Sequence, residues 1–185
     1  ATHRVGDPHY CSITGAACYD LATNKGTWIM DRNQFMRAAI ALAEKNVADG
    51  TGGPFGAVIV RDGEIVGEGT NQVTSANDPT AHAEVVAIRQ ACAKLGTFNL
   101  EGCEVYTSCE PCPMCLSAIY WARLDRIFYG NTKADAAEID FDDAFLYLEI
   151  PKPIAERTIP TEQMLHAESI KAFNAWAVSE DKIPY

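Results

Sequence analysis

The chain has 185 residues, of which 48% are hydrophobic, and this length and composition predict one globular domain with a sizeable core. The formal net charge is −10, and the sequence offers no basic patch of the kind that a tight RNA or DNA binder needs. No apolar run reaches transmembrane length. We therefore expect neither nucleic-acid nor membrane partners.

Residues 1–29 mix Gly, Thr, Cys, Tyr and His without a helical or strand period, and we treat them as an N-terminal extension of unknown role. The main domain is expected to span residues 30–185. A first helix is predicted over residues 31–48 because apolar side chains recur there every three or four positions. Asp31 or Asn33 would be its N-cap.

Short β-rich runs flanked by turn signals then predict four strands, at residues 55–60, 65–70, 103–107 and 126–129. The first two form a hairpin around Arg61–Glu64. Helices are expected after the second and third strands, so the later strands should pair in parallel through right-handed crossovers. A last amphipathic helix is predicted over residues 161–178.

A histidine and a glutamate lie where the second helix is expected to begin, in Thr80-Ala-His-Ala-Glu84. Pro79 suits a first helical turn because its missing N–H would have no partner there. His82 and Glu84 are two positions apart and would point about 200° apart on an ideal helix. We therefore expect one to bind a metal directly and the other to reach the metal-bound water.

Three cysteines follow in Ser108-Cys-Glu-Pro-Cys-Pro-Met-Cys115. Cys112 and Cys115 are three positions apart and would share a face of the next helix, with Pro111 just before it. The helix dipole would help to hold their thiolates. H-x-E followed by P-C-x-x-C is the signature of zinc-dependent deaminases of bases and nucleosides. His82, Cys112 and Cys115 would bind one Zn²⁺ per subunit and leave a fourth position open for water.

A closed structural zinc site is the main alternative, because Cys109 and Cys112 also form a C-x-x-C pair. Pro111 favours Cys112 and Cys115, since it leaves Cys109 before the helix. Glu84 also distinguishes the two, because a non-catalytic zinc-binding module has no use for a base. The cysteine count is seven, an odd number, and zinc ligation with buried thiols in a reducing cytoplasm explains it better than disulfides do.

The chain also resembles bacterial guanine deaminases of the cytidine deaminase-like superfamily over about residues 30–185. The residues that carry this resemblance, beyond the zinc motifs, are Gly52–Ala57, Asn71, Phe141-Asp-Asp143 and the terminal Ile183-Pro-Tyr185. The resemblance implies an α/β fold, a three-layer α/β/α domain around a mixed five-stranded sheet. Our own strand pattern gives four strands, and a fifth, which the resemblance implies, is expected around Arg157–Ile159. The resemblance also implies a homodimer in which the two chains exchange their C-terminal segments, about residues 144–185.

The implied reaction is hydrolytic deamination of guanine to xanthine and ammonia, catalysed by a hydrolase of purine metabolism. Zinc-bound hydroxide would attack the base, and Glu84 would shuttle the proton. Asn71 is expected to hydrogen-bond the purine, and Phe55 to stack on it or to serve the core. By resemblance, Asp143 and Tyr185 line the pocket, Tyr185 from the partner chain. Asp143 would anchor the substrate or transfer protons to the leaving amine.

Other small-molecule or macromolecular substrates stay open at this point. The same zinc motifs serve deaminases of another aminopurine, guanosine, cytosine or tRNA adenosine. The acidic charge disfavours the tRNA substrate, because phosphate contacts need Lys and Arg.

Overall fold

The computed structural model describes residues 31–184, so the N-terminal extension expected at residues 1–29 lies outside the described part of the chain. Four strands form one mixed sheet in the order β2-β1-β3-β4. Their bounds are β1 Gly56–Arg61, β2 Glu64–Thr70, β3 Cys103–Cys109 and β4 Arg126–Asn131. β1 pairs antiparallel with β2 and β3, whereas β3 and β4 are parallel, as the helical crossover predicted.

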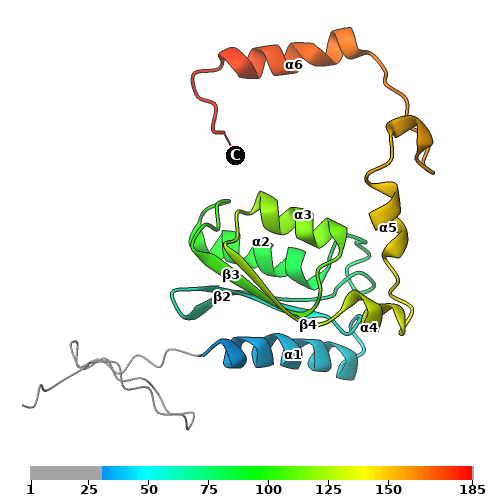
Figure 1. The fold of residues 1–185 in the computed structure, drawn as a ribbon. Coiled ribbons are helices and arrows are strands. Elements are labelled where there is room, and N and C mark those ends of the chain that lie inside the picture. The colour runs from blue at the N-terminus through cyan, green and yellow to red at the C-terminus, as the bar shows by residue number, and fades with distance from the viewer. Residues whose placement is uncertain (1–30, 185) are drawn as a thin grey trace, which may run out of the picture.

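Helices cover both faces of this sheet and give the three layers that were expected (Figure 1). α1 (Arg32–Ala48) lies on one face, and α2 (Ala83–Leu95) and α3 (Pro113–Trp121) lie on the other. Asp31 is confirmed as the N-cap of α1. Its side chain accepts a hydrogen bond from the Gln34 N–H, and the Gln34 side chain accepts one from the Asp31 N–H, both at 2.9 Å.

The core follows from alternation along the strands, which places successive side chains on opposite faces. Val58 and Val60 of β1 pack with Phe35 of α1, whereas Ala57 and Ile59 belong to the cluster under α2 and α3. Small residues let the helices approach closely. A Cβ on Gly69 of β2 would lie 2.1 Å from the carbonyl oxygen of Ala83, so the first turn of α2 rests directly on the strand.

The expected fifth strand is wrong: the sheet of the described residues has four strands. Residues 154–156 form a 3₁₀ turn, η1 (Ile154–Glu156), and the residues after it are irregular. The Thr158 N–H donates to Glu149 at 2.8 Å. The Arg157 side chain donates to the Lys152 carbonyl at 3.3 Å. Local partners therefore take the place of the ladder that a fifth strand would form.

The C-terminal part of the described chain, residues 133–184, forms an arm that extends away from the sheet (Figure 1). It contains α4 (Lys133–Ala137) beside the sheet, then α5 (Ala144–Glu149) and α6 (His166–Val178). α6 begins at His166, five positions after the predicted start at residue 161. The arm exposes large apolar side chains, among them Phe145, Leu148, Ile150, Met164, Phe173 and Trp176. Among residues 31–184, no helix has both the length and the apolar character to cross a membrane.

Candidate active site

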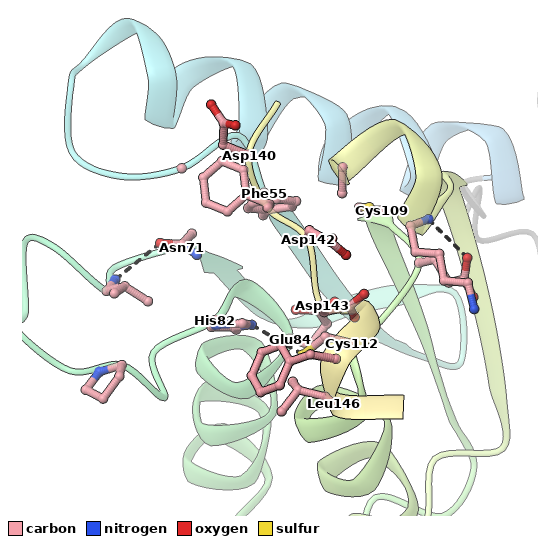
Figure 2. A pocket seen from close by; sticks show the side chains of 18 of the residues that line it. Phe55, Asn71, His82, Glu84, Cys109, Cys112, Asp140, Asp142, Asp143 and Leu146 are labelled. Atoms are coloured by element: carbon pink, nitrogen blue, oxygen red, sulfur yellow. Dashed lines mark hydrogen bonds between the residues drawn. The ribbon is translucent and has the colours of Figure 1, made fainter. Parts of the chain in front are cut away.

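Three possible metal ligands, His82, Cys112 and Cys115, converge where α2 and α3 begin. Figure 2 shows His82 and Cys112 beside Glu84. The His82 Nδ1 atom lies 3.6 Å from the Cys112 Sγ and 3.5 Å from the Cys115 Sγ. A tetrahedral zinc ion with Zn–S of about 2.3 Å and Zn–N of about 2.0–2.1 Å separates its N and S ligands by roughly 3.5–3.6 Å. The three donor atoms are therefore spaced to fit one zinc ion.

Both helices begin later than expected, and this changes how the donors meet. His82 is the N-cap of α2 and Cys112 is the N-cap of α3, each with an extended backbone (ψ 156° and 167°). The prediction that these two residues lie inside the helices is wrong, because α2 begins only at Ala83 and α3 only at Pro113. An extended N-cap is not bound by helical spacing. His82 can therefore point to the cysteines independently of Glu84.

The donor groups affect the proton affinity of one another. Hydrogen bonding to Cys115 and to His82 lowers the pKa of the Cys112 thiol to about 4 in spite of its burial. The neighbouring Cys112 and burial raise the pKa of the Cys115 thiol. A bound cation would favour loss of the proton from each thiol.

Cys109 lines the neighbouring cavity and does not belong to the group of metal donors. Within the described residues, the group that could hold a metal consists of His82, Cys112 and Cys115. Cys109 ends β3, and its Sγ donates to the Thr132 carbonyl at 3.6 Å. Burial raises the pKa of its thiol to about 11. This arrangement argues against the closed site in which Cys109 is a fourth ligand.

Glu84 lies in the first turn of α2 with 6% of its surface exposed. Thr107 of β3 donates a hydrogen bond of 3.1 Å to its Oε1 atom. Burial raises the pKa of the Glu84 carboxyl, and hydrogen bonds from its surroundings only partly oppose this. A buried carboxylate with raised proton affinity is suited to accept a proton and to return it.

One cavity of about 440 Å³ opens beside these residues (Figure 2). Its volume lies within the range of about 300–1,000 Å³ that small-molecule sites occupy. The expected site residues that line it are Phe55, Asn71, His82, Glu84, Cys112 and Asp143. The cavity lies at the carboxyl ends of β2 and β3, where ligands bind in open α/β sheets. Cys115 is fully buried behind this lining, and Tyr185 lies outside the described part of the chain.

Asn71 follows the last residue of β2 and is held by its backbone and its side chain. Its N–H donates to the Phe55 carbonyl at 3.1 Å, and its side-chain Oδ1 accepts from the Val73 N–H at 3.2 Å. The Val73 N–H uses one lone pair of Oδ1, and the amide NH₂ is the donor that Asn71 can offer to a ligand. A ligand with a hydrogen-bond acceptor therefore matches this wall.

Phe55 and a second aromatic residue, Phe141, both line the cavity. The Phe55 and Phe141 rings are 4.9 Å apart at 88°, an edge-to-face pair. Sequence reasoning noted Phe141 only as part of a resemblance and gave it no role. Its contact with Phe55 orients the ring that a flat ligand would meet.

Asp142 and Asp143 have different environments. Asp142 accepts a hydrogen bond from the Ala144 N–H at 2.8 Å, which is a local turn contact. Asp143 is the N-cap of α5, yet no side-chain capping bond forms there within the described residues. Burial and the nearby Cys112 charge raise the pKa of the Asp143 carboxyl. Asp143 therefore keeps its carboxyl group for the cavity.

Three convergent ligands and a buried glutamate beside an open cavity define a zinc-dependent hydrolytic deaminase. Residues 30–131 match the family described as the cytidine and deoxycytidylate deaminase zinc-binding region, and the chain belongs to this family. The family description and the donor cluster together give the protein one zinc cofactor.

The chain is similar to guanine deaminase of Bacillus subtilis (strain 168), with 55% identity over 156 residues that cover 84% of this chain and 100% of the relative. The X-ray structure of a Bacillus subtilis guanine deaminase superimposes with a TM-score of 0.82 over 84% of this chain and 99% of the other. A tRNA-specific adenosine deaminase of Aquifex aeolicus (strain VF5) is 41% identical over 101 residues, 55% of this chain and 66% of that protein.

Proposed function

We propose that this protein catalyses the zinc-dependent hydrolytic deamination of guanine to xanthine and ammonia. One observation carries the proposal: His82 and Cys112 of the metal-donor group line a single cavity of about 440 Å³ together with Glu84, Asn71 and Asp143. The similarity to a guanine deaminase along that relative's whole length supports guanine as the substrate.

His82, Cys112 and Cys115 would hold the zinc ion, because an imidazole and two thiolates at these spacings suit a tetrahedral site. When bound, zinc lowers the pKa of a coordinated water and so supplies a nucleophile at neutral pH. The remaining steps depend on the protein's own side chains.

Glu84 acts as the proton shuttle. Its carboxylate takes the proton of the attacking water and delivers it to N3 of guanine while the C2–O bond forms. A second transfer, to the 2-amino group, allows the C2–N bond to break, so one water is consumed and one ammonia is released. Thr107 holds one carboxylate oxygen and leaves the other for these transfers.

The walls of the cavity would bind the flat purine. The NH₂ group of Asn71 donates to an acceptor on the base, and Phe55 presents its ring for stacking. Asp143 either accepts a hydrogen bond from the substrate or assists protonation of the leaving amine. Both roles need a free Asp143 carboxyl group. Asp142, not Asp143, accepts the hydrogen bond from the Ala144 N–H, and among the described residues the Asp143 side chain makes no capping bond.

We also propose a homodimer in which residues 144–185 are exchanged and residues 30–185 form the catalytic domain. Phe173 of α6 is 72% exposed and Trp176 is 50% exposed, and no residue of α6 is buried. A chain with so much exposed apolar surface is typical of a protein that binds a partner. The exchange would place Tyr185 at the partner's cavity. A cytoplasmic location is supported by the free cysteines within residues 31–184.

Ammonia release from separate incubations with guanine, guanosine, cytosine and adenosine tests the substrate. We expect the zinc-loaded protein to act on guanine. Activity on another of the four and not on guanine would retain the zinc chemistry and refute the substrate. A zinc-loaded protein that is silent on all four would contradict the proposed reaction and favour a non-catalytic module.

A further inference from the structure

We propose that Asn46 of α1 is a positioning residue that fixes two walls of the cavity relative to each other and so sets the affinity for the base. Asn46 does not line the cavity, and it is only 4% exposed. The inference rests on the proposed deamination of guanine, because affinity for guanine is the quantity that it predicts.

The side chain of Asn46 bonds to both walls at once. Its Nδ2 group donates to the Gly53 carbonyl at 2.8 Å and to the Asn71 carbonyl at 2.9 Å. Gly53 and Asn71 both line the cavity. The Asn46 Oδ1 accepts from the Thr51 hydroxyl at 2.7 Å, which orients the amide. Two donors and one acceptor of a buried side chain are therefore satisfied in one arrangement.

These bonds close a ring of contacts around Asn71. The Gly53 carbonyl also accepts from the Phe55 N–H at 2.8 Å, and the Phe55 carbonyl accepts from the Asn71 N–H at 3.1 Å. The Asn71 backbone is thus fixed by Phe55 on one side and by Asn46 on the other. The proposed hydrogen-bonding amide and the proposed stacking ring cannot shift independently.

Close packing supports the same role. A Cβ on Gly52 would lie 2.0 Å from the Asn71 carbonyl oxygen and 2.9 Å from the Asn46 Nδ2. The loop, the strand end and α1 therefore meet without room for a methyl group. A buried amide that is fully bonded in such a place specifies one geometry, because any displacement breaks a bond in a medium of low dielectric.

A purely structural role for Asn46 is the alternative to be tested. In that case its bond to Thr51 would only stabilise the turn after α1, and its loss would lower the melting temperature without changing substrate affinity. A positioning role instead predicts weaker binding that is expressed in KM, since a wall that binds substrate and transition state equally changes KM and not kcat.

The test uses Asn46→Ala in the zinc-loaded, full-length protein. We expect KM for guanine to rise about tenfold or more, with kcat within about threefold and zinc content unchanged. In an inactive Glu84→Gln background, calorimetry should show the Kd for guanine rising by a similar factor. Thr51→Val removes only the hydroxyl that orients the amide, and a smaller rise, about two- to threefold, is expected.

Val60→Ala is the matched control, because Val60 is buried against α1 and does not line the cavity. It should lower the melting temperature and leave KM unchanged. If Asn46→Ala behaves like this control, the inference is overturned. If Asn46→Ala does not fold, an unchanged Kd in Thr51→Val overturns it as well. A wild-type protein that is inactive on guanine would contradict the proposed function itself, which separates the two failures.

Discussion

The hydroxyl of Thr107 on β3 donates a hydrogen bond of 3.1 Å to the carboxylate of Glu84 on α2. Both side chains are buried, so this bond joins the sheet to the helix that begins at the metal donors. It fixes one oxygen of the proposed proton shuttle. The first two predictions follow from it.

Replacing the proposed shuttle should abolish turnover and spare the metal. Glu84→Gln keeps the size of the side chain and removes its ability to accept a proton. We expect kcat to fall by at least about a hundredfold, with one zinc per chain retained. Metal content by mass spectrometry and ammonia release measure both. Glu68→Gln, at an exposed position on β2, is the control and should keep wild-type activity. Full activity of Glu84→Gln would refute the mechanism.

Removing the hydroxyl beside Glu84 should affect chemistry more than binding. Thr107→Val preserves the shape of the side chain and leaves the Glu84 Oε1 without this donor. We expect kcat to fall about tenfold with a smaller change in KM, because the carboxylate loses its fixed orientation. Thr107→Ser restores a hydroxyl and should recover most of kcat. Equal kinetics for the valine and serine variants would remove Thr107 from the mechanism.

Cysteine variants should separate metal ligands from the wall of the cavity. Cys112→Ala and Cys115→Ala each remove a donor near His82 and should lose bound zinc and activity together. Cys109→Ala should keep one zinc per chain, since the Cys109 Sγ faces the Thr132 carbonyl. Zinc stoichiometry after dialysis against a weak chelator measures this. Loss of zinc from the Cys109 variant would support a four-ligand structural site.

The neighbouring aspartates should differ in their effect on catalysis. Asp143→Asn removes the charge of a carboxyl that lines the cavity, and we expect kcat/KM for guanine to fall about a hundredfold. Asp142→Asn keeps an oxygen that can accept from the Ala144 N–H, so kcat/KM should stay within about threefold. Similar losses in both variants would show that the loop, not the Asp143 carboxyl, matters.

The proposed exchange of C-terminal segments can be tested by complementation. A chain that lacks residues 183–185 keeps Glu84 but has no tail, whereas a Glu84→Gln chain has the tail but no shuttle. Co-expressed, the two should form a mixed dimer with one complete site, and its activity should exceed that of either chain alone. Sedimentation checks that all three samples are dimers. A mixture no more active than its parts would mean that each tail serves its own chain or none.

The position of the metal donors could be predicted because short spacings determine it. Cys112 and Cys115 lie three positions apart at the start of α3, and His82 lies at the start of α2, the other helix on that face of the sheet. The starting residues could not be predicted, because Pro111 and Pro113 both suit a first turn and the sequence does not choose between them. The chain adopts the later start, which leaves Cys112 extended.

Features that depend on distant contacts were not visible in the sequence. Asn46 reads as an ordinary polar residue near the end of α1, and its partner Asn71 is fixed only when β2 returns beside the helix. The strand expected near Arg157–Ile159 was wrong for a similar reason. The family resemblance implied a fifth strand there, but the Glu149 carboxylate accepts the hydrogen bond of the Thr158 N–H.

Gly69 has no side chain, and its close contact with the start of α2 limits which residues can replace it. A methyl group there would press on the Ala83 carbonyl, one residue after His82 and one before Glu84. Alanine at this position would therefore displace a ligand and the proposed shuttle together without replacing any residue that carries a reactive group. Screening for inactive variants should consequently find substitutions near the end of the edge strand β2, at residues that do not line the cavity.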